Sequence, residues 1–205
     1  MPAFTGVWAS VLCFTPSWVT KLNFYEWKPL AEQGVAEAQY NLGLIYSRGQ
    51  EIPQDNSEAA HWYRLAAEQG FAEAQTNLGL MYGKGQGIEQ NYREAVKWYR
   101  LAAEQGLAQA QHNLGVMYGR GQGVVKNYQE AIWWFKLSAD QGYAQAQYNL
   151  GLMHNRGEGV PRDDKEAVKW YRLSAQQRIP GAQSNLGLMY EKGLGVKQDY
   201  IEAHK

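Results

Sequence analysis

One pattern of fourteen residues recurs along the chain at a fixed interval, and it constrains the fold more than any other feature. Its second copy reads AQTNLGLMYGKGQG, from Ala74 to Gly87. Each copy begins 36 residues after the previous one, at Ala38, Ala74, Ala110, Ala146 and Ala182. A period of this size is the signature of a repeat array. Such an array grows by adding units and not by enlarging one core.

Each unit is expected to contain two amphipathic helices joined by a glycine-rich loop, which predicts an all-α fold. In the second unit the first helix runs from about Ala72 to Lys84, with apolar side chains at helical spacing. Gly85 is suited to end this helix in the left-handed conformation. Asn91 is suited to cap the second helix, from about Tyr92 to Gln105. A basic residue stands beside the negative end of each first-helix dipole: Arg48, Lys84, Arg120, Arg156 and Lys192.

A glycine lies inside the first helix of every unit: Gly43, Gly79, Gly115, Gly151 and Gly187. An interior glycine costs roughly 1 kcal/mol relative to alanine, so its repetition needs a physical reason. We expect the second helix to approach so closely that any Cβ would collide with a Trp-Tyr pair such as Trp98 and Tyr99.

The repeats divide the chain into a non-repeat leader, residues 1–24, and a solenoid, residues 25–205. The leader is expected to be poorly ordered. The solenoid holds the end of a partial unit, four full units and a final partial unit: 26–35, 36–71, 72–107, 108–143, 144–179 and 180–205. Pro29 predicts a short first helix, because proline is tolerated only in the first turn. In the fourth unit, Arg178 replaces the glycine that ends the second helix elsewhere.

Composition excludes several classes of partner and leaves the compartment open. The chain has 20 basic and 20 acidic residues, so charge gives no reason to expect nucleic acid or an anionic membrane. No apolar run approaches the ~20 residues that span a bilayer. The apolar leader has no Lys or Arg before Lys21, unlike a typical signal peptide. The protein is expected to be cytoplasmic or, if the leader is a degenerate export signal, periplasmic or secreted.

No catalytic or metal-binding constellation is visible. The histidines His61, His112, His154 and His204 occupy unrelated positions in the repeat, and no cluster has metal-ligand spacing. The GxG loops lack the residues of a phosphate-binding motif. We therefore predict a non-enzymatic protein without a metal or cofactor.

Candidate contact residues lie on the first helix of each unit. The position before the NLG triplet varies among otherwise similar copies: Tyr40, Thr76, His112, Tyr148 and Ser184. The next position is always asparagine: Asn41, Asn77, Asn113, Asn149 and Asn185. An amide can donate to and accept from a peptide backbone at once, which suits capture of a partner segment. Alternatively, each asparagine bonds a neighbouring helix or loop and stabilises the stack.

The chain resembles the Sel1-like repeat, a relative of the tetratricopeptide repeat. The pattern A-x-A-x-x-x-L-G-x-x-Y-x-x-G-x-G-V, followed by D-x-x-x-A-x-x-W-Y-x-x-A-A-x-x-G, is met most fully by residues 72–106 and 108–142. The resemblance implies a right-handed superhelix of antiparallel helix pairs whose first helices line a concave groove. It also implies an adaptor or scaffold that binds a protein or peptide partner in that groove, where the candidate residues would project.

Two other functions remain open. A cysteine-rich group of Sel1-like proteins is linked to β-lactam binding or hydrolysis, which suggests a cell-wall-active hydrolase. That group carries a cysteine pair in every repeat, whereas Cys13 is the only cysteine here, so we disfavour this function. The second alternative is a structural spacer that self-associates through its open ends. The last unit stops early in its second helix, so we expect either a fragment of a longer array or an end that binds a partner.

Overall fold

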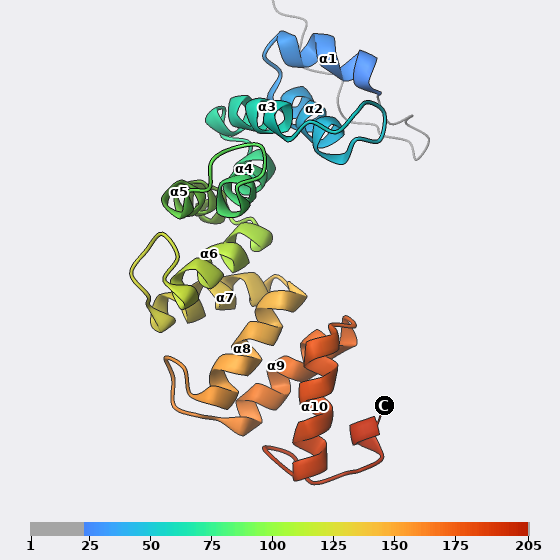
Figure 1. The fold of residues 1–205 in the computed structure, drawn as a ribbon. Helices are drawn as coiled ribbons and strands as arrows, with labels where there is room; N and C mark the ends of the chain where they lie inside the picture. The colour runs from blue at the N-terminus through green and yellow to red at the C-terminus, as the bar shows by residue number, and fades with distance from the viewer. Residues whose placement is uncertain (1–22, 205) are drawn as a thin grey trace, which may run out of the picture.

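The computed structural model describes residues 23–204, and within that range it contains ten α-helices, one short 3₁₀-helix and no strand (Figure 1). The helices are α1 (Phe24–Glu32), α2 (Ala36–Arg48), α3 (Asn56–Glu68), α4 (Ala72–Lys84), α5 (Tyr92–Glu104), α6 (Ala108–Arg120), α7 (Tyr128–Asp140), α8 (Ala144–Arg156), α9 (Asp164–Gln176) and α10 (Pro180–Lys192), with η1 (Glu202–His204) after them. The leader predicted for residues 1–24 lies outside the described residues, apart from Asn23 and Phe24, which begin α1.

The helices stack in chain order, each against its neighbours in sequence. The closest pairs are α2 with α3, α4 with α5, α6 with α7, and α8 with α9. Figure 1 shows the pairs following one another from α1 at one end to α10 at the other. Each unit therefore packs mainly against the units beside it, which confirms the predicted all-α solenoid.

Local signals in the sequence determine where the helices begin and end. The Asn91 side chain accepts hydrogen bonds from the backbone N–H groups of Arg93 and Glu94, at 3.0 and 3.2 Å. Gly85 ends α4 with φ of 68°. Both caps were predicted, and they recur: Asp55, Asn127 and Asp163 also cap second helices. The first helix α1 is short, as predicted, although Pro29 lies inside it and beyond its first turn.

The interior glycines lie where two helices touch. A Cβ placed on Gly79 would lie 2.8 Å from the Tyr99 ring, and one on Gly151 would lie 2.5 Å from the Tyr171 ring. Such distances are shorter than any ordinary contact between carbon atoms. The predicted close approach is confirmed. The opposing group is the second member of the aromatic pair, and in the third unit that member is Phe135.

The tryptophan of each pair has a different role, because it joins neighbouring units. Trp98 on α5 packs into the apolar cluster formed by α3 and α4, whereas Tyr99 packs into the cluster that includes α6. Trp134 on α7 repeats this arrangement one unit later. The cores therefore cross the boundaries between units, so adjacent units stabilise one another.

Buried glutamines form a second link between units that the sequence analysis did not single out. Gln111 is 5% exposed; its side chain donates to the Ala103 carbonyl at 3.2 Å and accepts from the Gln141 amide at 2.8 Å. The same pair of bonds recurs at Gln39, Gln75 and Gln147. Because a buried amide is costly unless bonded, this ladder requires each unit to dock in one register.

Candidate functional site

The predicted contact residues lie on α2, α4, α6, α8 and α10, the first helices of the units. Four hollows open along the first helices: the first lies between α1 and α2, and the other three lie between consecutive first helices from α2 to α8. Each shares a lining residue with the next. Leu44 belongs to the first and second hollows, Leu80 to the second and third, and Val116 to the third and fourth. Together the hollows form a continuous groove, which we call the first-helix groove. Four predicted asparagines line it: Asn41, Asn77, Asn113 and Asn149.

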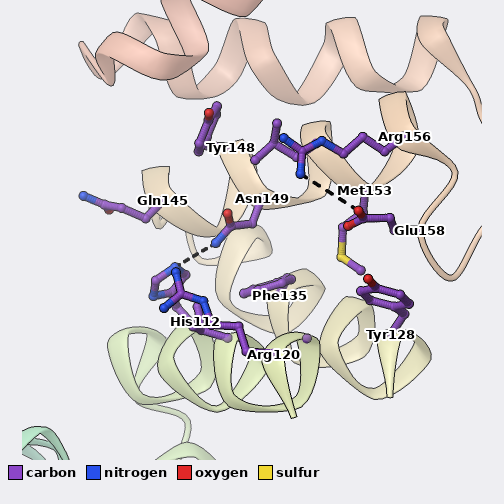
Figure 2. A pocket seen from close by; sticks show the side chains of 13 residues that line it. His112, Arg120, Tyr128, Phe135, Gln145, Tyr148, Asn149, Met153, Arg156 and Glu158 are labelled. Carbon is purple, nitrogen blue, oxygen red and sulfur yellow. Dashed lines mark hydrogen bonds and ion pairs between the residues drawn. The ribbon is translucent and has the colours of Figure 1, made fainter. Parts of the chain in front are cut away.

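The largest hollow lies between α6 and α8 and has a volume of about 450 Å³. It brings together three predicted residues, His112, Tyr148 and Asn149. Figure 2 shows His112 and Arg120 from α6 on one side, with Asn149 and Arg156 from α8 on the other. The remaining lining includes four apolar side chains: Val116, Phe135, Leu152 and Met153. The hollow therefore combines apolar contact area with amide and guanidinium groups.

Two further rows of side chains run beside the asparagines along the first helices, and the members on α2 to α8 line the groove. Residues three and seven positions after each asparagine lie on the same face of an α-helix. The first row is aliphatic: Leu44, Leu80, Val116, Leu152 and Leu188. The second is basic: Arg48, Lys84, Arg120, Arg156 and Lys192. From the sequence, the basic residues were assigned only a role at the negative end of the helix dipole. The 36-residue period together with helical spacing was the signal that could have assigned both rows to the groove.

His112 is held in its neutral form by its neighbours. The Asn149 side-chain nitrogen lies 3.0 Å from His112 Nε2, and because that nitrogen can only donate, Nε2 accepts and carries no proton. Nδ1 then carries the proton and donates to the Asn113 side-chain oxygen at 3.3 Å. Burial lowers the pKa of His112, and the nearby charge of Arg120 lowers it further, although the bond to Asn113 opposes this.

Three of the asparagines bond inside the protein, and one of these bonds, from Asn149, reaches a neighbouring first helix. Asn41 donates to the Glu37 carbonyl at 2.9 Å, while Asn113 and Asn149 both bond His112. A primary amide has two N–H donors and two acceptor lone pairs, so one such bond leaves capacity for others. The row can therefore position the helices and still bond a ligand.

The variable position before each asparagine is less uniform than predicted. Tyr40 is half-buried, with its ring centroid 5.0 Å from that of Phe71, whereas Ser184 is exposed. The prediction that Thr76 contacts a partner was wrong, because its side chain is only 2% exposed. Its hydroxyl donates to the Ala72 carbonyl at 2.9 Å, one turn earlier on the same helix. A short side chain satisfied in this way does not reach a partner.

The described residues show no sign of a metal site or a membrane span. Among residues 23–204, no group of three or more His, Cys, Asp or Glu side chains has the arrangement to hold a metal ion. Within the same range, every helix is too short or too polar to cross a bilayer.

Stacked antiparallel helix pairs with a groove along their first helices define the tetratricopeptide-like class of helical-repeat proteins. Within that class, the chain belongs to the Sel1 repeat family. The Sel1 repeat model matches residues 36–71, 72–107, 108–143, 144–178 and 180–205. Proteins of this family generally act as protein-interaction scaffolds, and their fold is generally non-enzymatic.

Solved structures agree with this assignment. A Sel1 repeat protein from Oxalobacter formigenes is 35% identical, with a TM-score of 0.80, and the match covers 88% of this chain and 52% of that one. The protective antigen c5321 of uropathogenic Escherichia coli is 36% identical, with a TM-score of 0.72 and coverage of 89% and 47%. The chain thus spans about half the length of these two proteins.

A more distant structure shares the fold alone. The immunity protein Pa5087 from Pseudomonas aeruginosa is 20% identical, with a TM-score of 0.56, and the match covers 88% of this chain and 65% of that one. No curated protein shows significant sequence similarity to the chain.

Proposed function

We propose that the protein is a non-catalytic scaffold that binds an extended segment of a partner protein in the first-helix groove. The observation that carries the proposal is the repetition of hollows from unit to unit along the groove. Its hollows share lining residues from α2 to α8, and each unit contributes the same kinds of side chain.

The chemistry of the groove suits a peptide. An extended segment exposes backbone N–H and C=O groups along its length, and side-chain amides can bond both kinds of group. The aliphatic row beside the asparagines offers contact area to apolar side chains of the segment. Burying one such side chain contributes about 1.5–3 kcal/mol relative to leaving it in water.

Variants that remove apolar contacts test the proposal. Val116→Ser with Leu152→Ser takes two half-buried aliphatic side chains from the floor of the α6–α8 hollow. Leu101→Ser with Leu173→Ser is the matched control, because these leucines lie on second helices and are 39% and 44% exposed. The probe is a display library of random ten-residue peptides selected against the full chain.

We expect the selected peptides to bind the unaltered chain and the control variant equally, and to lose tenfold or more in affinity for the groove variant. Circular dichroism checks that all three proteins are equally helical. Equal affinity for both variants would exclude the groove as the binding site.

The two other hypotheses predict different outcomes. A β-lactam-active hydrolase would turn over a chromogenic cephalosporin, and such turnover by the purified protein would overturn the scaffold proposal. A self-associating spacer would show a mass above 23.2 kDa by light scattering and no groove-dependent peptide binding.

A further inference from the structure

We propose that the segment bound in the groove is acidic, with its carboxylates placed against Arg120 and Arg156 of the basic row, on α6 and α8. This inference rests on the proposed function and specifies the chemistry of the partner.

Members of the basic row line three of the four hollows of the groove. Arg48 lines the hollow between α1 and α2, and Lys84 lines the hollow between α4 and α6. Arg120 lines both hollows that flank α6. Arg156 faces Arg120 across the largest hollow. A role at the helix dipole alone would not require these side chains to border the groove.

Most of these cations lack an internal counter-charge. Among the described residues, ion pairs within 4.0 Å do not involve Arg48, Lys84, Arg120 or Lys192. Arg156 pairs with Glu158, but the two charged atoms are 3.9 Å apart and Arg156 is 58% exposed. A pair this long and exposed contributes little, so a ligand carboxylate can displace it.

Residues on the opposite edge of the groove favour binding of the acidic segment in the C-terminal half of the solenoid. Gln145 lines the largest hollow one turn before Asn149, and Gln109 holds the same position in the unit before. In the first two units that position carries Glu37 and Glu73. Carboxylates there would repel an acidic ligand, whereas the two glutamines would not.

Arginine is well matched to such a ligand. Its planar guanidinium can bind a carboxylate through two parallel N–H···O bonds, and these charge-assisted bonds are stronger than neutral ones. An acidic segment with intervening apolar residues would contact the basic and aliphatic rows together. A nucleic acid would also satisfy the cations, but it would not use the aliphatic floor formed by Val116 and Leu152.

Three pools of labelled ten-residue peptides test the inference. Alternate positions carry Asp or Glu in the first pool, Asn or Gln in the second, and Lys or Arg in the third, with Ala, Val, Leu or Ser between them. The charge variant is Arg120→Gln with Arg156→Gln. Its matched control is Lys97→Gln with Lys169→Gln, which removes the same charge from exposed positions on second helices.

We expect the acidic pool to bind roughly tenfold more tightly than the neutral pool, and its affinity to fall as NaCl is raised. The charge variant should lose that advantage, and the control should keep it. Equal binding of the acidic and neutral pools, or tighter binding of an oligothymidylate than of the acidic pool, would overturn the inference.

The outcomes also separate this inference from the proposed function. If the neutral pool binds as well as the acidic one, and Val116→Ser with Leu152→Ser abolishes that binding, the groove remains the site and only the acidic preference fails. If binding survives both the charge variant and the serine variant, both proposals fail.

Discussion

The Asn149 side-chain amide donates a hydrogen bond to Nε2 of His112, joining two first helices across the largest hollow of the groove at 3.0 Å. The bond requires a neutral imidazole, because a protonated ring would present a second donor to the donating amide. The groove geometry at this point is therefore coupled to the protonation of one histidine.

Acidification should destabilise the protein through His112. Burial lowers the folded-state pKa of His112 below the unfolded value of about 6.5, so the unfolded chain takes up the proton first as pH falls. The free energy of unfolding should be unaffected by this group above that value. It should decline as pH drops below about 6.5 and level off below the folded-state pKa.

Urea unfolding at several pH values measures this decline, and imidazole NMR signals give the folded-state midpoint. His112→Tyr is the control, since Tyr40 and Tyr148 occupy the equivalent position in other units. A variant with the same pH dependence as the unaltered protein would contradict the prediction.

Replacing Gly151 by alanine should destabilise the protein by about 1–3 kcal/mol through overpacking. The new Cβ would lie 2.5 Å from the Tyr171 ring, and this clash outweighs the better helix propensity of alanine. Gly119→Ala is the control, because its Cβ would have no neighbour nearer than 3.7 Å. That change should stabilise the protein by roughly 0.5–1 kcal/mol, so stabilisation by both changes would show that the close approach at Gly151 can relax.

Replacing Gln111 by alanine should lower the free energy of unfolding by about 1–3 kcal/mol, because it removes the two buried hydrogen bonds that this side chain makes to the Gln141 amide and the Ala103 carbonyl. Thermal and urea unfolding followed by circular dichroism report the change. Gln109→Ala, at an exposed position on the same helix, should remain within about 0.5 kcal/mol of the unaltered protein. Similar losses of unfolding free energy at both positions would mean that the buried glutamine bonds between units do not stabilise the fold.

Replacing Arg178 by glycine should stabilise the fourth unit by about 1 kcal/mol. Arg178 has φ of 63°, a left-handed conformation in which a side chain is strained. Glycines hold the equivalent positions in other units, with φ of 89° at Gly70 and 90° at Gly106. Gly106→Ala should therefore destabilise the protein, and calorimetric melting of the two variants should shift in opposite directions.

The sequence predicted the helix boundaries well because their causes are local. Gly85 ends α4 through its own backbone dihedral angles, and Asn91 begins α5 through hydrogen bonds to residues two and three positions ahead. The interior glycine at position 79 was also interpretable, since its repeated cost indicated a close neighbour. The identity of that neighbour, Tyr99 and not Trp98, depended on the crossing of α4 and α5.

The site was predicted only in part. The repeat pattern correctly predicted that His112, Tyr148 and Asn149 lie on first helices. That all three side chains line one hollow depends on the distance between α6 and α8, which the sequence does not give. Thr76 stands at the same repeat position and is buried, whereas Ser184, also a short side chain at that position, is exposed. Position in a repeat therefore does not determine exposure.

The sequence by itself determined the period, the helix pairs, their caps and the small residues at their crossings. Each of these follows from interactions within a helix or from spacing along it. Only the tertiary structure decided which polar residues face inward, as Gln111 does, and which border the groove, as Arg120 does. Both are polar side chains on α6, and their environments differ because the packing of neighbouring units covers one face of that helix and leaves the other open.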